Sequence, residues 1–181
     1  WGHTGTGKSS LVRELCIDNQ LGFIDKRLSQ DEASDLRGLP DKKDGRTIYL
    51  PPTDMPLGGM KYEEYQQYID SVKVTGRPWE MEVQLQPRLN NGILFLDELN
   101  RCQDDVSQAS FQLVLDRRLG QYVLPPGWSI VCAGNYMEGY NTNGFTDPAY
   151  LNRFCHLQLS NDTNTVSEWI DYMKLHYEDN I

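Results

Sequence analysis

The stretch GHTGTGKS, residues 2–9, leads directly into a run of helical periodicity and decides the fold class. Gly2, Gly7, Lys8 and Ser9 match GxxxxGK followed by Ser or Thr, the phosphate-binding loop called Walker A. The glycines let successive backbone amides point at phosphate oxygens, and the following helix adds the positive end of its dipole. The alternative, a glycine-rich turn that merely caps a helix, fits this loop-to-helix context less well.

The loop predicts a bound nucleoside triphosphate with Mg²⁺. Lys8 is expected to neutralise the β and γ phosphates, and the Ser9 hydroxyl is expected to ligate the metal. The predicted nucleotide-binding residues form one continuous segment: Gly2, His3, Thr4, Gly5, Thr6, Gly7, Lys8, Ser9 and Ser10.

A second motif, ILFLDELNR at residues 93–101, places two carboxylates at the end of an apolar run. An unbroken apolar run after Gly92 is typical of a strand buried on both faces of a parallel sheet. We expect Asp97 to hold the metal and Glu98 to act as the general base that polarises the attacking water. The alternative is an ordinary acidic loop between a strand and a helix.

Strand and helix patterns alternate along the chain, which predicts an α/β fold with a parallel sheet flanked by crossover helices. A hairpin around Asp44-Gly45 is expected to interrupt this order. We expect Asp31 to cap a short helix, Gly120 to end the helix after LDELNR, and Pro148 to open another. The predicted strands cover residues 21–25, 80–86, 92–98, 128–135 and 154–159, and a further helix covers 62–72.

Four segments carry a family resemblance: GHTGTGKS, ILFLDELNR, the strand that ends in Asn135, and LNRF at residues 151–154. They occur in the order seen in AAA+ ATPases, which the chain resembles, and DELNR with the hairpin resembles the MoxR-like branch. The resemblance implies a P-loop NTPase core that uses ATP and Mg²⁺. It also implies that Asn135 is the sensor 1 residue and that Arg153 is an arginine finger acting on ATP held by the next subunit. The alternatives are a strand-end turn residue for Asn135 and a surface ion pair for Arg153.

The same resemblance implies a homo-oligomeric, hexameric ring that remodels a protein substrate, often with a von Willebrand factor A domain partner. The hairpin at 39–52 is expected to project towards the pore or partner, unless it is an ordinary surface hairpin. Residues 1–160 are expected to form the AAA+ core without its first strand, and 161–181 to begin the connection to a helical lid. Two other functions stay open: a McrB-like, GTP-driven DNA translocase and a nucleotide-binding scaffold without turnover.

Composition narrows the partners. With 17 basic and 26 acidic residues the formal net charge is −9, which argues against a surface that binds nucleic acid or anionic lipid. No apolar run approaches the roughly 20 residues that a membrane span requires. The four cysteines form no CxxC pair and are expected to be reduced core residues. These features predict a cytoplasmic protein.

Overall fold

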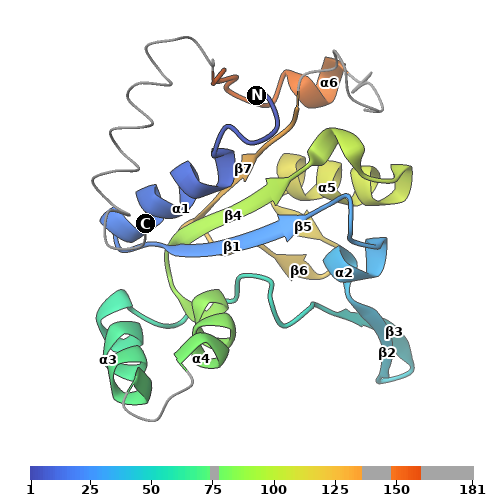
Figure 1. Ribbon diagram of the computed structural model, residues 1–181. Helices are drawn as coiled ribbons and strands as arrows, with labels where there is room; N and C mark the ends of the chain where they lie inside the picture. Colours follow the sequence, from blue (N-terminus) through green and yellow to red (C-terminus); the bar gives the residue numbers. More distant parts are fainter. Residues whose placement is uncertain (74–77, 136–147, 160–181) are drawn as a thin grey trace.

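The computed structural model describes residues 1–73, 78–135 and 148–159, and its centre is a parallel sheet (Figure 1). The strands lie in the order β1 (Gly22–Arg27), β4 (Gly92–Asp97) and β7 (Trp128–Cys132), all parallel. The middle strand β4 is buried from Gly92 to Leu96, as its unbroken apolar sequence requires. The predicted parallel α/β sheet is confirmed.

Helices cover both faces of this sheet (Figure 1). Helix α1 (Lys8–Asp18) packs on one face, where Cys16 and Val12 contact a cluster that includes Ile93 and Phe95. Helices α2 (Ala33–Arg37) and α5 (Asp104–Asp116) belong to the larger core on the other face. Because strand side chains alternate between faces, odd-numbered residues of β4 meet α1 and even-numbered residues meet α5.

Two further helices lie beyond the amino ends of the strands, α3 (Tyr62–Lys73) and α4 (Pro78–Leu85), followed by the 3₁₀ turn η1 (Gln86–Arg88). Helix α3 was predicted, but the strand prediction for 80–86 is wrong. Met81 and Leu85 pack into the core one helical turn apart, whereas Val83 between them is 63% exposed. Met81, Val83 and Leu85 alternate with polar residues as in a strand, but Met81 and Leu85 are also four residues apart, as on one face of a helix. The pattern of these seven residues therefore does not distinguish a strand from a helix.

The predicted hairpin is confirmed as β2 (Leu39–Lys43) paired antiparallel with β3 (Arg46–Leu50), and it extends away from the sheet (Figure 1). Asp44 and Gly45 both have positive φ, as a two-residue hairpin turn of this twist requires. Its side chains are exposed apart from Ile48, so the hairpin buries almost no apolar surface of its own.

The end of α5 differs from the prediction. The helix stops at Asp116 with Arg117 in the left-handed conformation, and Gly120 instead occupies the turn of a small hairpin, β5 (Arg118–Leu119) and β6 (Tyr122–Val123). The Arg117 guanidinium donates to the carbonyls of Pro125 and Trp128. These bonds tie the end of α5 to the start of β7, and Arg117 is therefore a structural residue.

Other boundaries also moved. Glu32, rather than Asp31, is the N-cap of α2, and its backbone N–H donates to Asp35 Oδ2 at 2.8 Å. Helix α6 (Pro148–Leu151) begins at the predicted proline. Residues 154–159 do not form the predicted strand, because their ladder is a single bridge between Leu159 and Gly2. The start of the predicted lid connection, 161–181, lies outside the described residues. Within the described part of the chain, no helix is long and apolar enough to cross a membrane.

Candidate functional site

The predicted phosphate loop lies between the end of β7 and the start of α1. Gly5 and Gly7 have φ of 79° and 75°, values that L-residues with side chains rarely adopt. No side chain caps α1, so the first amides of this helix stay available to a ligand. The loop is closed by Thr6 Oγ1, which donates to the carbonyl of His3 at 2.9 Å. This geometry is the one that an anion-binding loop requires.

Lys8 joins the loop to the predicted sensor residue. Its Nζ donates to the carbonyls of Gly2 at 3.1 Å and His3 at 2.8 Å, and to Asn135 Oδ1 at 2.9 Å. Asn135 follows β7 and is 5% exposed. The fold therefore brings together two predicted site residues that lie 127 positions apart in the sequence.

Asp97 ends β4 and Glu98 follows it, at the same edge of the sheet as Asn135, because parallel strands present their carboxyl ends together. Asp97 ends the strand on the α1 face, and its Oδ1 accepts the N–H of Glu98 at 2.8 Å. Glu98 has φ of 55°, so the chain turns sharply there before the 3₁₀ turn η2 (Leu99–Arg101). The two adjacent carboxylates consequently occupy different positions, as the two predicted roles require.

Two neighbours of this pair were not predicted. The Ser29 hydroxyl, just beyond β1, donates to Glu98 Oε2, and Arg101 Nη1 lies 3.6 Å from Glu98 Oε1. Asn100, 3% exposed, is bonded to the backbone of Asn135. A single sequence carries no signal for Ser29, because it lies in an unremarkable turn 69 residues away. Asn100 stands inside the quoted motif, but its burial appears only in the fold.

Asp25 adds negative charge on the same face of the sheet. Burial raises the pKa of this carboxyl, and the charge of Asp97 raises it further, whereas Arg27 and Arg13 act in the opposite direction. Asp25 lies on β1 two residues before Arg27, which pairs in register with Asp97. Asp25 and Asp97 form a charged group with Arg13 and Arg27 beside α1.

Arg153 lies at the end of α6, on the same side of the molecule as Lys8. It is exposed, and its backbone N–H donates to the carbonyl of Tyr150 at 3.1 Å. Among the described residues, no carboxylate forms an ion pair with it. Arg153 and Lys8 both line an apolar cavity of about 400 Å³ along the outer edge of β7. The surface ion pair that was the alternative for Arg153 is therefore not seen in this part of the structure.

The residues present fit a nucleoside triphosphate with Mg²⁺. The loop supplies amides and one ammonium group, and Ser9 and Asp97 supply a hydroxyl and a carboxylate at the ends of neighbouring elements. Mg²⁺ at phosphate sites usually takes only one or two carboxylates and fills its other positions with water and phosphate oxygens.

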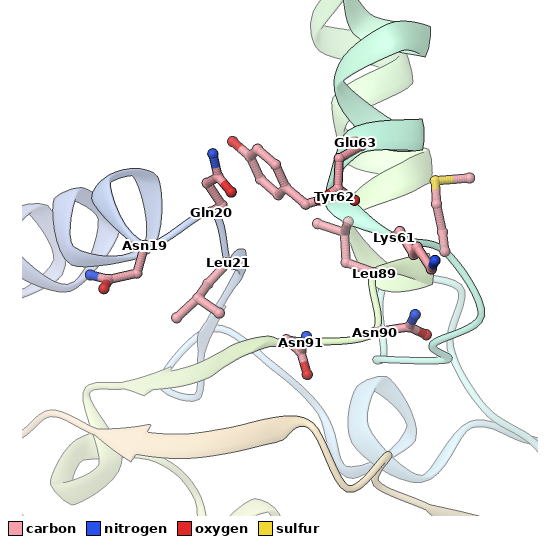
Figure 2. Close-up of a pocket in the computed structure, with 10 residues that line it drawn as sticks. Asn19, Gln20, Leu21, Lys61, Tyr62, Glu63, Leu89, Asn90 and Asn91 are labelled. Carbon is pink, nitrogen blue, oxygen red and sulfur yellow. The ribbon is translucent and has the colours of Figure 1, made fainter.

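A second cavity, of about 530 Å³, lies at the opposite end of the sheet (Figure 2). Asn19, Gln20, Asn90 and Asn91 line it together with Lys61, Tyr62 and Glu63. Figure 2 shows these side chains coming from the end of α1, the start of α3 and the loop before β4. None of the predicted site residues belongs to this cavity.

Comparison with known proteins supports the P-loop fold that the phosphate loop and the parallel sheet indicate. The chain is 31% identical to the magnesium-chelatase 38 kDa subunit of Chlorobaculum parvum over an alignment of 198 positions. This alignment covers 98% of the chain and 55% of that protein, so the chain spans about half the length of its relative. The parallel sheet flanked by helices, with a phosphate loop before α1, is consistent with an AAA+ P-loop core. No family model matches the chain, and the match to this relative does not single out the MoxR-like branch.

Proposed function

We propose that this AAA+ core belongs to an ATP-hydrolysing motor subunit. The observation that supports it most directly is the 2.9 Å hydrogen bond between Lys8 Nζ and Asn135 Oδ1, beside the carboxylates that end β4. A loop that only binds phosphate has no need of a buried amide and a carboxylate pair at the next strand ends. This argues against a scaffold that holds nucleotide without turnover.

Each residue has a proposed task in hydrolysis. Lys8 and the loop amides hold the phosphates, and Ser9 with Asp97 would hold Mg²⁺, which when bound neutralises charge on the phosphate oxygens. Glu98 accepts a proton from the attacking water, and Asn135 orients that water. Arg153, exposed and unpaired with any described carboxylate, supplies its charge to the ATP site of a neighbouring subunit.

We further propose that the motor assembles as a ring in the cytoplasm, and the MoxR-like resemblance suggests a hexamer. This ring would remodel a protein partner such as a von Willebrand factor A domain protein. The exposed β2–β3 hairpin is the element that reaches this partner. The relative's name favours a second form, in which the motor is one subunit of a magnesium chelatase. A GTP-driven DNA translocase is disfavoured by the net charge of −9.

The decisive experiment replaces Glu98 with Gln in the full-length protein. Glu98→Gln removes the base but keeps the shape, so ATP binding should be unchanged while turnover falls by about a hundredfold or more. Binding of a fluorescent ATP analogue and phosphate release measure the two quantities. Undiminished turnover would remove Glu98 from this role. GTP displacing the analogue better than ATP does would favour the DNA translocase instead.

A further inference from the structure

A buried amide pair connects the turn after β4 to the end of β7. Asn100 Nδ2 donates to the carbonyl of Asn135 at 2.7 Å, and the N–H of Asn135 donates to Asn100 Oδ1 at 3.2 Å. Asn100 and Asn135 are 3% and 5% exposed, so water does not compete for these groups. One side chain thus satisfies both backbone groups of one residue.

Asn100 makes this pair of bonds because its carboxamide carries a donor and an acceptor side by side. A carboxylate has no donor when ionised, and a hydroxyl group is too short to reach both a carbonyl and an N–H. Leaving either backbone group of Asn135 buried without a partner costs about 1–3 kcal/mol. Asn100 is therefore chemically specified, although an asparagine in a polar motif such as DELNR looks like a surface residue in the sequence.

The surrounding backbone is built around this pair. The N–H of Leu99 donates to the carbonyl of Ala133 at 3.0 Å, so the turn η2 is attached to the end of β7 at two neighbouring points. Gly134 leaves room for the contact, since a Cβ there would lie 3.2 Å from Asn100 Oδ1 and 2.6 Å from the ring of Trp1. The turn that follows Glu98 and the residue that contacts Lys8 are fixed relative to each other.

We propose that Asn100 is a positioning residue, which acts on the site through Asn135. By holding both backbone groups of Asn135, Asn100 directs the Asn135 side chain towards Lys8. It also fixes the position of Asn135 relative to Glu98, which lies two residues before Asn100. Its contribution falls on the rate of hydrolysis and not on the affinity for ATP, because among the described residues Asn100 is hydrogen-bonded to Asn135 and to no residue of the phosphate loop. This inference rests on the proposed ATPase function.

The test is a double-mutant cycle in the full-length protein with Asn100→Ala, Asn135→Ala and both together. If Asn100 acts through Asn135, Asn100→Ala should lower kcat by about tenfold or more while KM for ATP stays within about twofold. In the Asn135→Ala background the same change should have almost no further effect. Fully additive losses in kcat, or a loss confined to KM, would overturn the proposal.

A second readout does not depend on turnover. Amide exchange at Asn135, followed by NMR, should become at least about tenfold faster in Asn100→Ala, because its N–H loses the only acceptor described for it. Asn90→Ala at the far end of the sheet is the matched control and should leave this rate unchanged. Unchanged exchange in Asn100→Ala would refute the positioning role. Absence of ATP turnover in the wild-type chain would refute the proposed function, and the exchange rate would still decide whether Asn100 holds Asn135.

Discussion

The two ends of the parallel sheet carry polar side chains of different kinds. At the carboxyl ends of the strands stand one ammonium group, two carboxylates and the buried pair of asparagines, drawn from Lys8, Asp97, Glu98, Asn100 and Asn135. At the amino ends stand four carboxamides around the second cavity (Figure 2). Both ends are polar, and Lys61 and Glu63 also bring opposite charges to the second cavity, but at the first end the Lys8 ammonium group is held by hydrogen bonds, one of them to the buried Asn135.

Two of the four carboxamides at the amino ends are hydrogen-bonded to the backbone. Asn19 Nδ2 donates to the carbonyl of Leu15 at 2.8 Å, and Asn90 Oδ1 accepts the N–H of Gly59 at 2.8 Å. Beside them the fully buried ring of Trp128 lies against Gly22 and Gly92, where a Cβ would come within 2.9 Å and 2.6 Å of it. Packing and loop hydrogen bonds hold this end of the sheet together around the cavity. A polar lining alone therefore does not indicate a reactive site, whereas charged groups held in fixed positions make a site a candidate.

The largest effect should follow from Lys8→Ala. This change removes the one ammonium group that the loop offers to the phosphates, so ATP affinity should fall by about a hundredfold, measured with a fluorescent analogue.

Mixing Lys8→Ala with Arg153→Ala subunits should restore part of the turnover, since each mutant supplies at a shared interface what the other lacks. A mixture no more active than its separate components would show that Arg153 does not act on a neighbouring site.

A smaller effect is expected at the opposite end. Asn90→Ala leaves the Gly59 N–H without its acceptor and should lower the free energy of unfolding by about 1 kcal/mol, measured by urea denaturation. Turnover per folded molecule should not change. Asn90→Asp, which keeps the acceptor oxygen, is the control and should be close to wild type. A loss of turnover in either variant would contradict the contrast between the two ends.

The smallest effect concerns Asp31, which follows β1 at the carboxyl end but on the face away from α1. Its Oδ2 is buried without a hydrogen-bond partner among the described residues. Burial raises the pKa of this carboxyl; Lys26 opposes the rise, and Asp35 and Asp54 add to it. The folded state therefore binds this proton more tightly than the unfolded state does, so the ionised group costs stability at neutral pH and the cost disappears as the pH falls through the raised pKa.

Asp31→Asn should accordingly stabilise the protein at pH 7, by about 1 kcal/mol or less. The advantage should shrink on acidification, because the wild-type carboxyl then becomes neutral as well. Thermal melts of both proteins at several pH values measure the difference. A variant less stable than wild type at pH 7 would mean that the attraction between Asp31 and the buried Lys26 outweighs the cost of burial.

The sequence by itself determined the phosphate loop, the central strand β4 and the β2–β3 hairpin. Each rests on local chemistry: glycines that permit positive φ before a helix, an apolar run too regular to face water, and an Asp-Gly turn between extended arms. It also placed Lys8, Asp97, Glu98 and Asn135 at strand and helix ends, where a parallel sheet gathers them. Their catalytic roles remain predictions.

Tertiary structure alone decided the rest, because contacts across long separations have no local pattern. The hydrogen bonds from Ser29 to Glu98 and from Asn100 to Asn135 exist only once β1, β4 and β7 lie side by side. The same holds for α4. Its seven-residue alternation is equally compatible with a strand, and only the packing of Met81 and Leu85 in the core shows that the segment is a helix. Residue types and spacing set which groups could react, and packing of the three strands set which of them are held in place to do so.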